Sequence, residues 1–295
     1  MPELPEVETI RRHLAPHVEG RVLGRLDVLD PRWTAPLPPS AVEDAVAGRR
    51  IEALGRRGKY LVWALEDEVH LIAHLRMTGT MLLDPAPSVP YARVRFHIAD
   101  GPVLVFSDPR RFGTGELALG DAARDAFFAA RLGPESFATT PTALRALARG
   151  SRAPVKAFLL DQKRLAGVGN IYADEALHRA HIHPLRPAGR LTGPQWAALH
   201  AAVVDALQAG IAAKGASIDD FRDPYGVQGS FQDEFLVHRR EGEPCPRCGA
   251  PIRKLVVAGR GTYVCERCQR RPRARRYAAS ASSARRPALS SRASS

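Results

Sequence analysis

Apolar residues near the start of the chain recur at the spacing of a helix face. Val7, Ile10 and Leu14 lie three or four positions apart, with polar residues between them. Pro5 suits the first turn of such a helix, and the pattern has ended by Gly20. The sequence therefore predicts an amphipathic helix that ties the beginning of the chain to a packed core.

Between about residue 21 and residue 119, the apolar residues follow strand patterns instead. They form short β-rich runs or alternate with polar residues, and Asp100-Gly101 is a hairpin signal. Proline-rich pieces at 31–39 and 85–90 are typical of loops. These patterns predict a β-sandwich capped by the first helix. The clearest predicted strands are Tyr60–Leu65, Val69–Ala73, Arg93–Ile98 and Val103–Phe106.

The residues Leu132-Gly133-Pro134-Glu135 indicate a domain boundary, and after them the apolar residues recur at helical spacing. Within residues 160–175, one helix ends, two turns pass through Gly167 and Gly169, and a new helix begins. The predicted helices are Pro141–Arg149, Pro154–Leu160, Asn170–Arg179 and Pro194–Ile211. The fold class is therefore α+β and multidomain. We expect a catalytic β-sandwich domain at 1–133, a linker at 134–150, a helical domain at 151–240, a metal-binding module at 241–270 and a basic tail at 271–295.

Composition and charge narrow the class of partner. The chain is 45% hydrophobic and 25% charged, and it has neither an apolar run of transmembrane length nor a signal peptide, so we expect a cytoplasmic protein. The formal net charge is +12, of which seven charges lie in the acid-free tail, leaving +5 for the rest. This balance favours nucleic acid over a membrane as the partner. The tail is expected to be disordered, and it either adds salt-sensitive DNA affinity or has no consequence.

All four cysteines lie in two Cys-x-x-Cys pairs that are separated by 16 residues. This spacing is typical of a zinc site closed by four thiolates, which leaves no open position for catalysis. Strand-like residues between the pairs predict a β-hairpin with Arg260 at its tip, where a guanidinium suits a backbone phosphate. We therefore expect one structural zinc ion. The predicted ligands are Cys245, Cys248, Cys265 and Cys268.

The second residue, Pro2, offers a different chemistry. Removal of Met1 would leave a secondary amine that titrates near pH ~8, well below a lysine at ~10.4. The unprotonated amine is a nucleophile that can form an iminium ion with a sugar aldehyde carbon, and Glu3 beside it could move protons. Many proteins begin Met-Pro and use neither residue, so the dipeptide alone does not decide the matter.

The longer stretch from Pro2 to Arg12 closely resembles the N-terminus of the formamidopyrimidine-DNA glycosylases, which are bifunctional base-excision repair enzymes. Three later stretches resemble the same family in the same order, and the resemblance covers residues 1 to about 270. They are the motif Asp108–Gly113, the helix, two turns and helix around residues 160–175, and the four-cysteine hairpin.

The resemblance implies a reaction and a partner. The family removes oxidised purines, such as 8-oxoguanine and formamidopyrimidines, from duplex DNA. Pro2 would attack the sugar C1′ and displace the base, and Glu3 would assist protonation and ring opening. The Schiff base would then permit β,δ-elimination, which cuts the strand on both sides of the lost nucleoside. The resemblance implies a monomer with one structural zinc ion and no nucleotide cofactor.

The resemblance also assigns roles to individual residues, by motif position in this sequence. A glycosylase must extrude its target nucleotide and fill the gap with an apolar wedge and arginines. Met77, Arg110 and Phe112 fall on the positions for this task, with Arg111 beside them, and Arg110 would face the orphaned cytosine. The loop at 215–230 would close over the everted base. The remaining expected DNA contacts are Lys59 and Lys156 near the lesion, Asn170 and Tyr172 of the two-turn motif, and Arg260, with Lys59 and Arg260 also counted as catalytic.

Three other interpretations stay open. Without the resemblance, the basic loops would be ordinary surface charge and the Met and Phe would be core residues. An endonuclease VIII-like enzyme would share the chemistry but act on oxidised pyrimidines; its N-terminus typically has glycine where this chain has Leu4, and it lacks the Arg110/Phe112 motif. A catalytically silent zinc-ribbon DNA-binding protein would need neither a free Pro2 nor Glu3.

Overall fold

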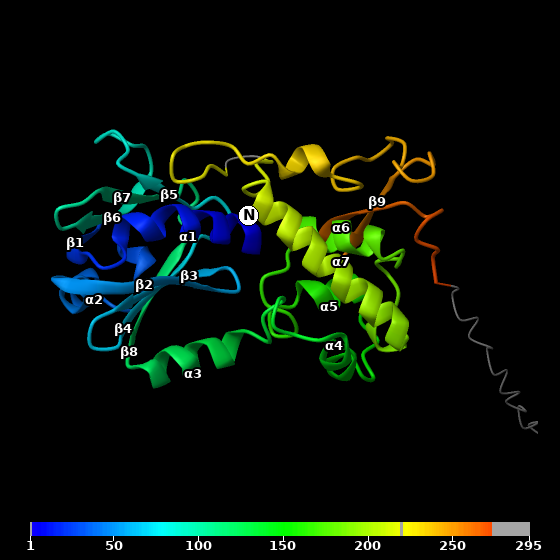
Figure 1. Ribbon diagram of the computed structural model, residues 1–295, viewed down its shortest axis with the longest axis horizontal. Helices are drawn as coiled ribbons and strands as arrows, with labels where there is room; N and C mark the ends of the chain where they lie inside the picture. Colours follow the sequence, from blue (N-terminus) through cyan, green and yellow to red (C-terminus); the bar gives the residue numbers. More distant parts are fainter. Residues whose placement is uncertain (1, 219–220, 273–295) are drawn as a thin grey trace, which may run out of the picture.

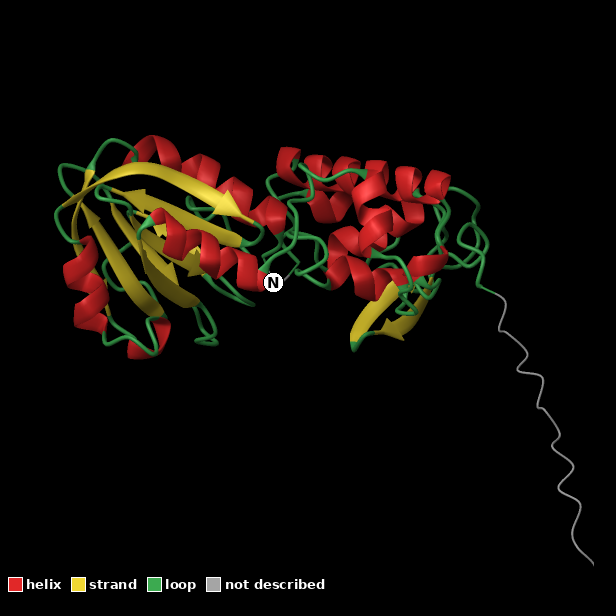
Figure 2. Ribbon diagram, turned by 90° about the horizontal axis from the view of Figure 1, so that it is seen from below, coloured by secondary structure: helices red, strands yellow, loops and turns green. Residues whose placement is uncertain are grey.

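The protein consists of two lobes that meet near the start of the chain. The computed structural model describes residues 2–218 and 221–272, so the predicted tail falls outside it from residue 273 onward. One lobe is a folded sheet with helices on it, the other is helical with a small hairpin, and the N-terminus lies between them (Figures 1 and 2). Among the described residues, no helix is both long and apolar enough to cross a lipid bilayer.

The first lobe contains one antiparallel sheet of eight strands that folds back on itself as a sandwich. The strand order is β5-β7-β6-β1-β2-β3-β4-β8. β1 and β2 pair through only two residue pairs, Val22 with Arg50 and Leu23 with Arg49, and the two layers diverge from this corner. The strands are β1 Val22–Val28, β2 Arg49–Arg57, β3 Tyr60–Leu65, β4 Val69–His74, β5 Thr80–Leu83, β6 Ala92–Ile98, β7 Val103–Ser107 and β8 Thr114–Leu119.

Three helices accompany the sheet. They are α1 Leu4–Val18, α2 Pro39–Val46 and α3 Asp121–Arg131, and a 3-10 turn spans Pro31–Trp33. The sandwich and its first helix confirm the predicted fold class, but the region predicted as strands and loops also contains α2. Only Val42 and Val46 of α2 and only Phe128 of α3 are buried. The sequence patterns missed both helices, which present only two and one buried residues to the core.

The helical lobe is built from α4 Pro141–Leu147, α5 Val155–Leu160, α6 Asn170–Arg179 and α7 Gly193–Ala212. Two 3-10 turns, Ala188–Arg190 and Phe231–Glu234, and the hairpin of β9 Arg253–Val257 and β10 Arg260–Val264 complete it. Thr192 caps α7, since its side chain and that of Gln195 each accept a hydrogen bond from the other's backbone amide. The hairpin packs beside α6, which connects it to the helical core.

Helix α1 contributes to both hydrophobic cores. Val7, Ile10 and Leu14 are fully buried in the core of the sandwich, with Trp63 and Phe96. Leu4, one turn before Val7, is instead fully buried in the core of the helical lobe. The first turn of α1 is therefore held by the second lobe and the remainder by the first, which fixes the chain start at their junction.

This arrangement makes a prediction about Leu4. Leu4→Ala should cost about 2–5 kcal/mol of stability, the range for a buried leucine truncation. Because the cavity opens in the helical core, amide hydrogen exchange should accelerate in α6. Leu14→Ala, on the same helix, should instead accelerate exchange in the strands that it contacts. Unchanged exchange in α6 of the Leu4 variant would show that the side chain does not join the lobes.

Candidate active site

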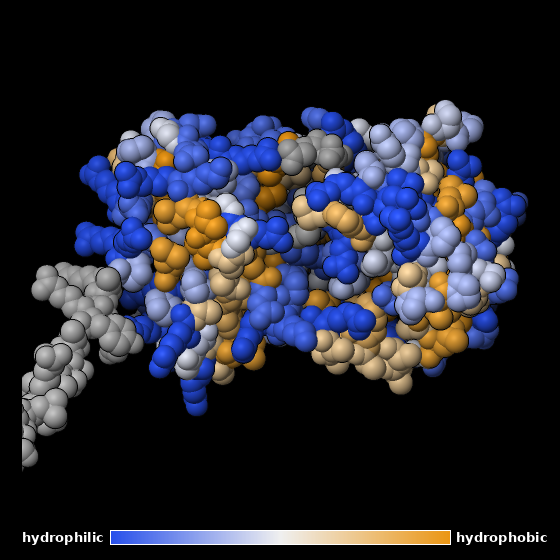
Figure 3. Space-filling model, turned by 180° about the vertical axis from the view of Figure 1, so that it is seen from behind, coloured by the Kyte–Doolittle hydropathy of each residue, from blue (hydrophilic) through white to orange (hydrophobic). Residues whose placement is uncertain are grey.

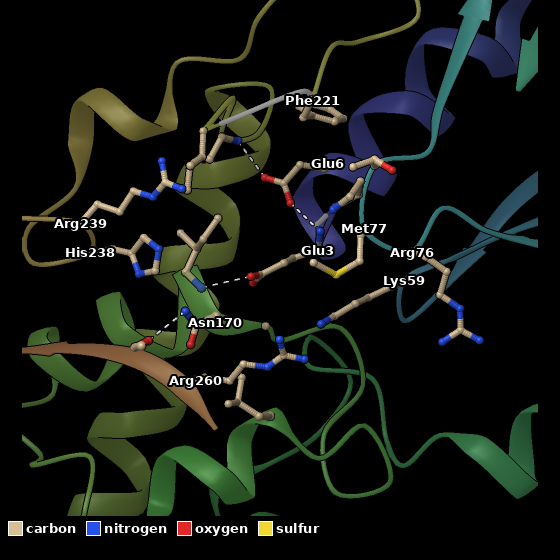
Figure 4. Close-up of a pocket in the computed structure, with 18 of the residues that line it drawn as sticks. Glu3, Glu6, Lys59, Arg76, Met77, Asn170, Phe221, His238, Arg239 and Arg260 are labelled. Atoms are coloured by element: carbon tan, nitrogen blue, oxygen red, sulfur yellow. Dashed lines mark hydrogen bonds between the residues drawn. The ribbon is translucent and has the colours of Figure 1, made fainter. Parts of the chain in front are cut away.

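A cleft of about 780 Å³ runs between the lobes, and the beginning of the chain lines it. Pro2, Glu3 and Glu6 come from the N-terminal segment, Lys59 from the turn between β2 and β3, and Arg260 from the hairpin. Glu3, Lys59 and Arg260 point toward the same space from three different elements (Figure 4). On the face of the molecule in Figure 3, hydrophilic side chains spread over both lobes between smaller apolar patches.

Backbone groups of the second lobe hold Glu3. Its carboxylate Oε1 accepts a hydrogen bond from the amide of Ile171 at the N-terminus of α6, at 3.1 Å, and the side chain is 2% exposed. The amide of Leu4 donates to the carbonyl oxygen of Gly167 at 3.2 Å. Gly169 lies directly against the carboxylate, so any side chain there would collide with it. Because the two glycines of the predicted turns have no side chains, the N-terminal segment can pack directly against them.

Glu6 forms a second buried carboxylate beside the first. It accepts hydrogen bonds from the Glu3 amide at 2.7 Å, from the Tyr172 hydroxyl at 2.8 Å and from the Ala216 amide at 2.8 Å. Burial, and then the negative charge of Glu3, raise the pKa of Glu6 above its ordinary value. The raised pKa favours the protonated form of Glu6 more than is usual for an exposed glutamate.

Lys59 places an amine opposite these acids. Its side chain is 5% exposed, and burial lowers its pKa, while the charges of Glu3 and Glu6 oppose that shift. The turn that presents Lys59 is held by Glu135 of the linker. Glu135 accepts hydrogen bonds from Arg57 Nη1 at 2.8 Å, from Arg56 Nη1 at 3.2 Å and from the Gly58 amide.

The hairpin tip and the start of α6 face the other side of the cleft. Arg260 is exposed and begins β10. The side-chain amide of Asn170 donates to the carbonyl oxygen of Gly261 at 3.0 Å, which ties the hairpin to the helix. The N-terminus of α6 and the Arg260 guanidinium together give this side of the cleft a positive character suited to a phosphate.

Lys156 and Tyr172 lie behind the cleft wall, which differs from the expectation that they contact DNA. The Lys156 side chain is fully buried. Its ammonium forms an ion pair with Asp174 Oδ1 at 2.7 Å and donates to Thr262 Oγ1 at 2.7 Å and the Gly261 carbonyl at 3.1 Å. Tyr172 is also fully buried, and its ring stacks on Phe231 with centroids 5.1 Å apart. Each polar group has partners inside the protein, and neither residue lines the cleft.

The expected wedge residues divide into two kinds. Met77 and Arg110 line the cleft, and Phe112 is 50% exposed with the Arg110 guanidinium 4.8 Å from its ring centroid. Arg111 turns away and forms a bidentate pair with the buried carboxylate of Asp30, at 2.6 and 2.8 Å. Arg111 therefore fixes its loop to the sandwich, while the other three side chains are presented to the outside.

Sequence reasoning missed several residues of the cleft. His74 and Arg76 line it, and burial, aided by the charge of Arg76, lowers the pKa of His74 to about 3, so His74 is neutral at physiological pH. The sequence signal for both was the basic stretch at a strand end. The loop from residue 215 contributes Ala216, Ile218 and Phe221, and the hairpin side contributes His238, Arg239, Lys254 and Tyr263.

The four cysteines form one cluster, as their spacing predicts. Their sulfur atoms lie within 4.8 Å of one another, with Cys245 and Cys268 at 3.9 Å and Cys248 and Cys265 at 3.5 Å. A tetrahedral zinc ion with Zn–S bonds of about 2.3 Å places sulfurs about 3.8 Å apart, so the thiolates fit this metal. The cluster lies at the base of the hairpin, since one cysteine pair precedes β9 and the other follows β10.

The fold and the site define a class: a nucleic-acid-binding protein that buries its own chain start in a cleft between a β-sandwich and a helical lobe with a zinc-binding hairpin. Three family models match in sequence order. They describe the formamidopyrimidine-DNA glycosylase N-terminal domain over residues 1–115, its H2TH domain over 132–222, and a zinc finger found in that enzyme and in IleRS over 242–271. The chain belongs to the formamidopyrimidine-DNA glycosylase family.

Individual relatives agree with this placement. Formamidopyrimidine-DNA glycosylase of Chloroflexus aurantiacus is 47% identical over 91% of this chain and 98% of its own length. The enzyme of Thermus thermophilus is 45% identical over 91% and 98%. The Lactococcus lactis enzyme, solved with DNA that contains an abasic site, superposes with a TM-score of 0.85 at 36% identity over 92% of this chain and all of the other.

The buried ion pair of Lys156 leads to a prediction about stability and DNA binding. Lys156→Met should leave Asp174 without its cation, which typically costs about 3–5 kcal/mol of stability. Because the lost donors also hold Gly261 and Thr262, DNA binding should weaken even though the Lys156 side chain is buried. Lys163→Met is the matched control, since that lysine is exposed. Thermal unfolding and titration with labelled duplex measure both effects. Normal stability with weakened binding would instead indicate a direct DNA contact.

Proposed function

We propose that this protein is a bifunctional DNA glycosylase and abasic-site lyase that excises oxidised purines from duplex DNA in base excision repair. The observation that carries the proposal is the position of Pro2, which lines the cleft beside Glu3, Glu6 and Lys59. Removal of Met1 would make the Pro2 nitrogen a secondary amine, and an amine among groups that can exchange protons is what Schiff-base chemistry at a sugar carbon requires.

The proposed reaction begins at the nitrogen of Pro2. Its lone pair attacks C1′ of the damaged nucleotide, the C1′–N bond to the base breaks, and the base leaves with a proton. Opening of the sugar ring gives an iminium ion on Pro2. Loss of a C2′ proton then expels the 3′ phosphate, and a second elimination expels the 5′ phosphate. Water releases the remaining sugar fragment from the amine.

Glu3 is proposed to move protons in these steps. Its carboxylate Oε1 is held by the Ile171 amide, whereas Oε2 is buried without a hydrogen-bond partner among the described residues. A buried acceptor of this kind costs free energy unless a ligand satisfies it. A sugar oxygen or the departing base could supply that partner, and Glu6, with its raised pKa, lies next in line as a proton reserve.

The other cleft residues are proposed to position the DNA. Lys59, Asn170 and Arg260 would bind backbone phosphates around the everted nucleotide, since each presents nitrogen donors to one side of the cleft. Met77, Arg110 and Phe112 would fill the gap in the stack. Phosphate contacts of this kind release counterions, so affinity should fall as salt rises. We further propose that the protein acts as a monomer in the bacterial cytoplasm, at the nucleoid.

One alternative concerns the lesion. The Lactococcus lactis relative has also been solved with DNA that contains an oxidised pyrimidine, so family membership does not by itself decide between purine and pyrimidine substrates. Leu4, buried in the helical core, and the presented Arg110 and Phe112 favour the purine-specific assignment. A silent DNA-binding protein is disfavoured because it would gain nothing from burying two carboxylates beside a chain terminus.

The proposal predicts the products of two matched duplexes. A duplex with 8-oxoguanine opposite cytosine should lose its base and be cut to fragments with phosphate at both ends of the gap. A duplex with an oxidised pyrimidine at the same position should react more slowly. Pro2→Gly keeps an amine but changes it from secondary to primary, so cutting should slow strongly while DNA binding persists. Gel analysis against phosphate-ended markers measures both.

Faster excision from the pyrimidine duplex would indicate an endonuclease VIII-like enzyme instead. Binding without base loss on either duplex would leave the silent DNA-binding protein as the better description.

A further inference from the structure

Two loops that present the wedge residues lie side by side because of how the sandwich is connected. The Met77 loop, residues 75–79, runs from β4 to β5, and the Phe112 loop, residues 108–113, runs from β7 to β8. At one end, His74 of β4 pairs with Thr114 of β8, and at the other, Thr80 of β5 pairs with Ser107 of β7. Strand pairing therefore aligns the two loops at both of their ends.

A buried carboxylate joins the loops between those ends. Asp108 is fully buried, and its Oδ2 accepts the amides of Phe112 and Gly113, each at 2.8 Å. Its Oδ1 accepts the Arg110 amide at 3.1 Å and the hydroxyl of Thr78, which belongs to the other loop. Three bonds thus shape the Phe112 loop, and the fourth attaches the Met77 loop to it.

An aromatic ring also packs against both loops. Phe106 is 1% exposed, and its ring lies against Gly79 of the Met77 loop and Gly113 of the Phe112 loop. A side chain at either glycine would collide with the ring. The loops consequently share one polar anchor and one apolar support, which leaves little freedom for either to move alone.

We propose that Asp108 is a positioning residue whose carboxylate couples the two loops, so that Met77, Arg110 and Phe112 enter the duplex as one unit. The inference rests on the proposed function, because it concerns how the wedge acts. A carboxylate that accepts four donors is a strong hydrogen-bond centre, and removing its charge leaves buried amides unsatisfied. The coupling matters because an orphaned base and an emptied stack must be filled together.

The Thr78 hydroxyl provides the cleanest test, since it makes the one side-chain bond that passes from loop to loop through Asp108. Thr78→Val removes the hydroxyl at nearly constant volume, and Thr78→Ser keeps it. With 8-oxoguanine opposite cytosine, Thr78→Val should slow single-turnover base excision about fivefold, the effect of one hydrogen bond, and Thr78→Ser should react at the parent rate. Cutting at a preformed abasic site should slow less than excision in Thr78→Val, because the gap must still be filled there but no base has to be extruded.

A double-mutant cycle separates coupling from a contact of Thr78 with DNA. If Thr78 acts through the Met77 loop, its substitution by valine should have little further effect in a Met77→Ala background. Asp108→Asn should slow excision more than Thr78→Val, because an amide of the same shape cannot accept from all four donors. Thermal unfolding of each variant identifies any general loss of fold.

The inference is overturned if Thr78→Val excises at the parent rate, if it slows both substrates equally, or if its full effect persists beside Met77→Ala. A parent chain that cuts abasic sites but excises no damaged base would contradict the proposed function itself, which a variant effect alone cannot do.

Discussion

The structure depends on the burial of two carboxylates, those of Glu3 and Glu6, where the chain start meets the helical lobe. Neither side chain is more than 2% exposed, and acidic groups in such a place are costly to bury unless donors surround them. The donors come from the other lobe: the amides of Ile171 and Ala216 and the hydroxyl of Tyr172. The same bonds that offset this cost therefore bring the lobes together around Pro2.

A second buried network supports the opposite wall of the cleft. Asp174 binds the ammonium of Lys156 and the ring nitrogen Nδ1 of His238, at 2.7 and 2.9 Å, and Lys156 holds the backbone of the hairpin. The hairpin in turn carries Arg260 and is closed at its base by the four thiolates. The exposed Arg260 is thus held in position by ion pairs behind the cleft wall, before DNA binds.

Much of this architecture was predictable from the sequence. The stripe of Val7, Ile10 and Leu14, the alternating strands and the cysteine spacing each follow from local periodicity, and the structure agrees with them. Local periodicity does not reveal whether a polar side chain points toward a ligand or pairs with another residue of the protein. Lys156 and Arg111 fall in motifs that suggest DNA contacts, yet each pairs with a carboxylate elsewhere in the chain. Asp174 holds Lys156 in the interior, and Asp30 holds the partly exposed Arg111 against the sandwich. The role of Leu4 in the opposite lobe's core was hidden for the same reason.

The central claim is that Pro2, and not a lysine, is the nucleophile, and the cleft contains a real competitor. Lys59 also carries an amine in the cleft, and burial lowers its pKa from the ordinary lysine value. Borohydride trapping on a duplex with 8-oxoguanine opposite cytosine, followed by digestion and mass mapping of the adduct, tests the claim directly. The account predicts a covalent adduct on a peptide that begins with Pro2. An adduct on Lys59, or on a chain that retains Met1, would contradict it.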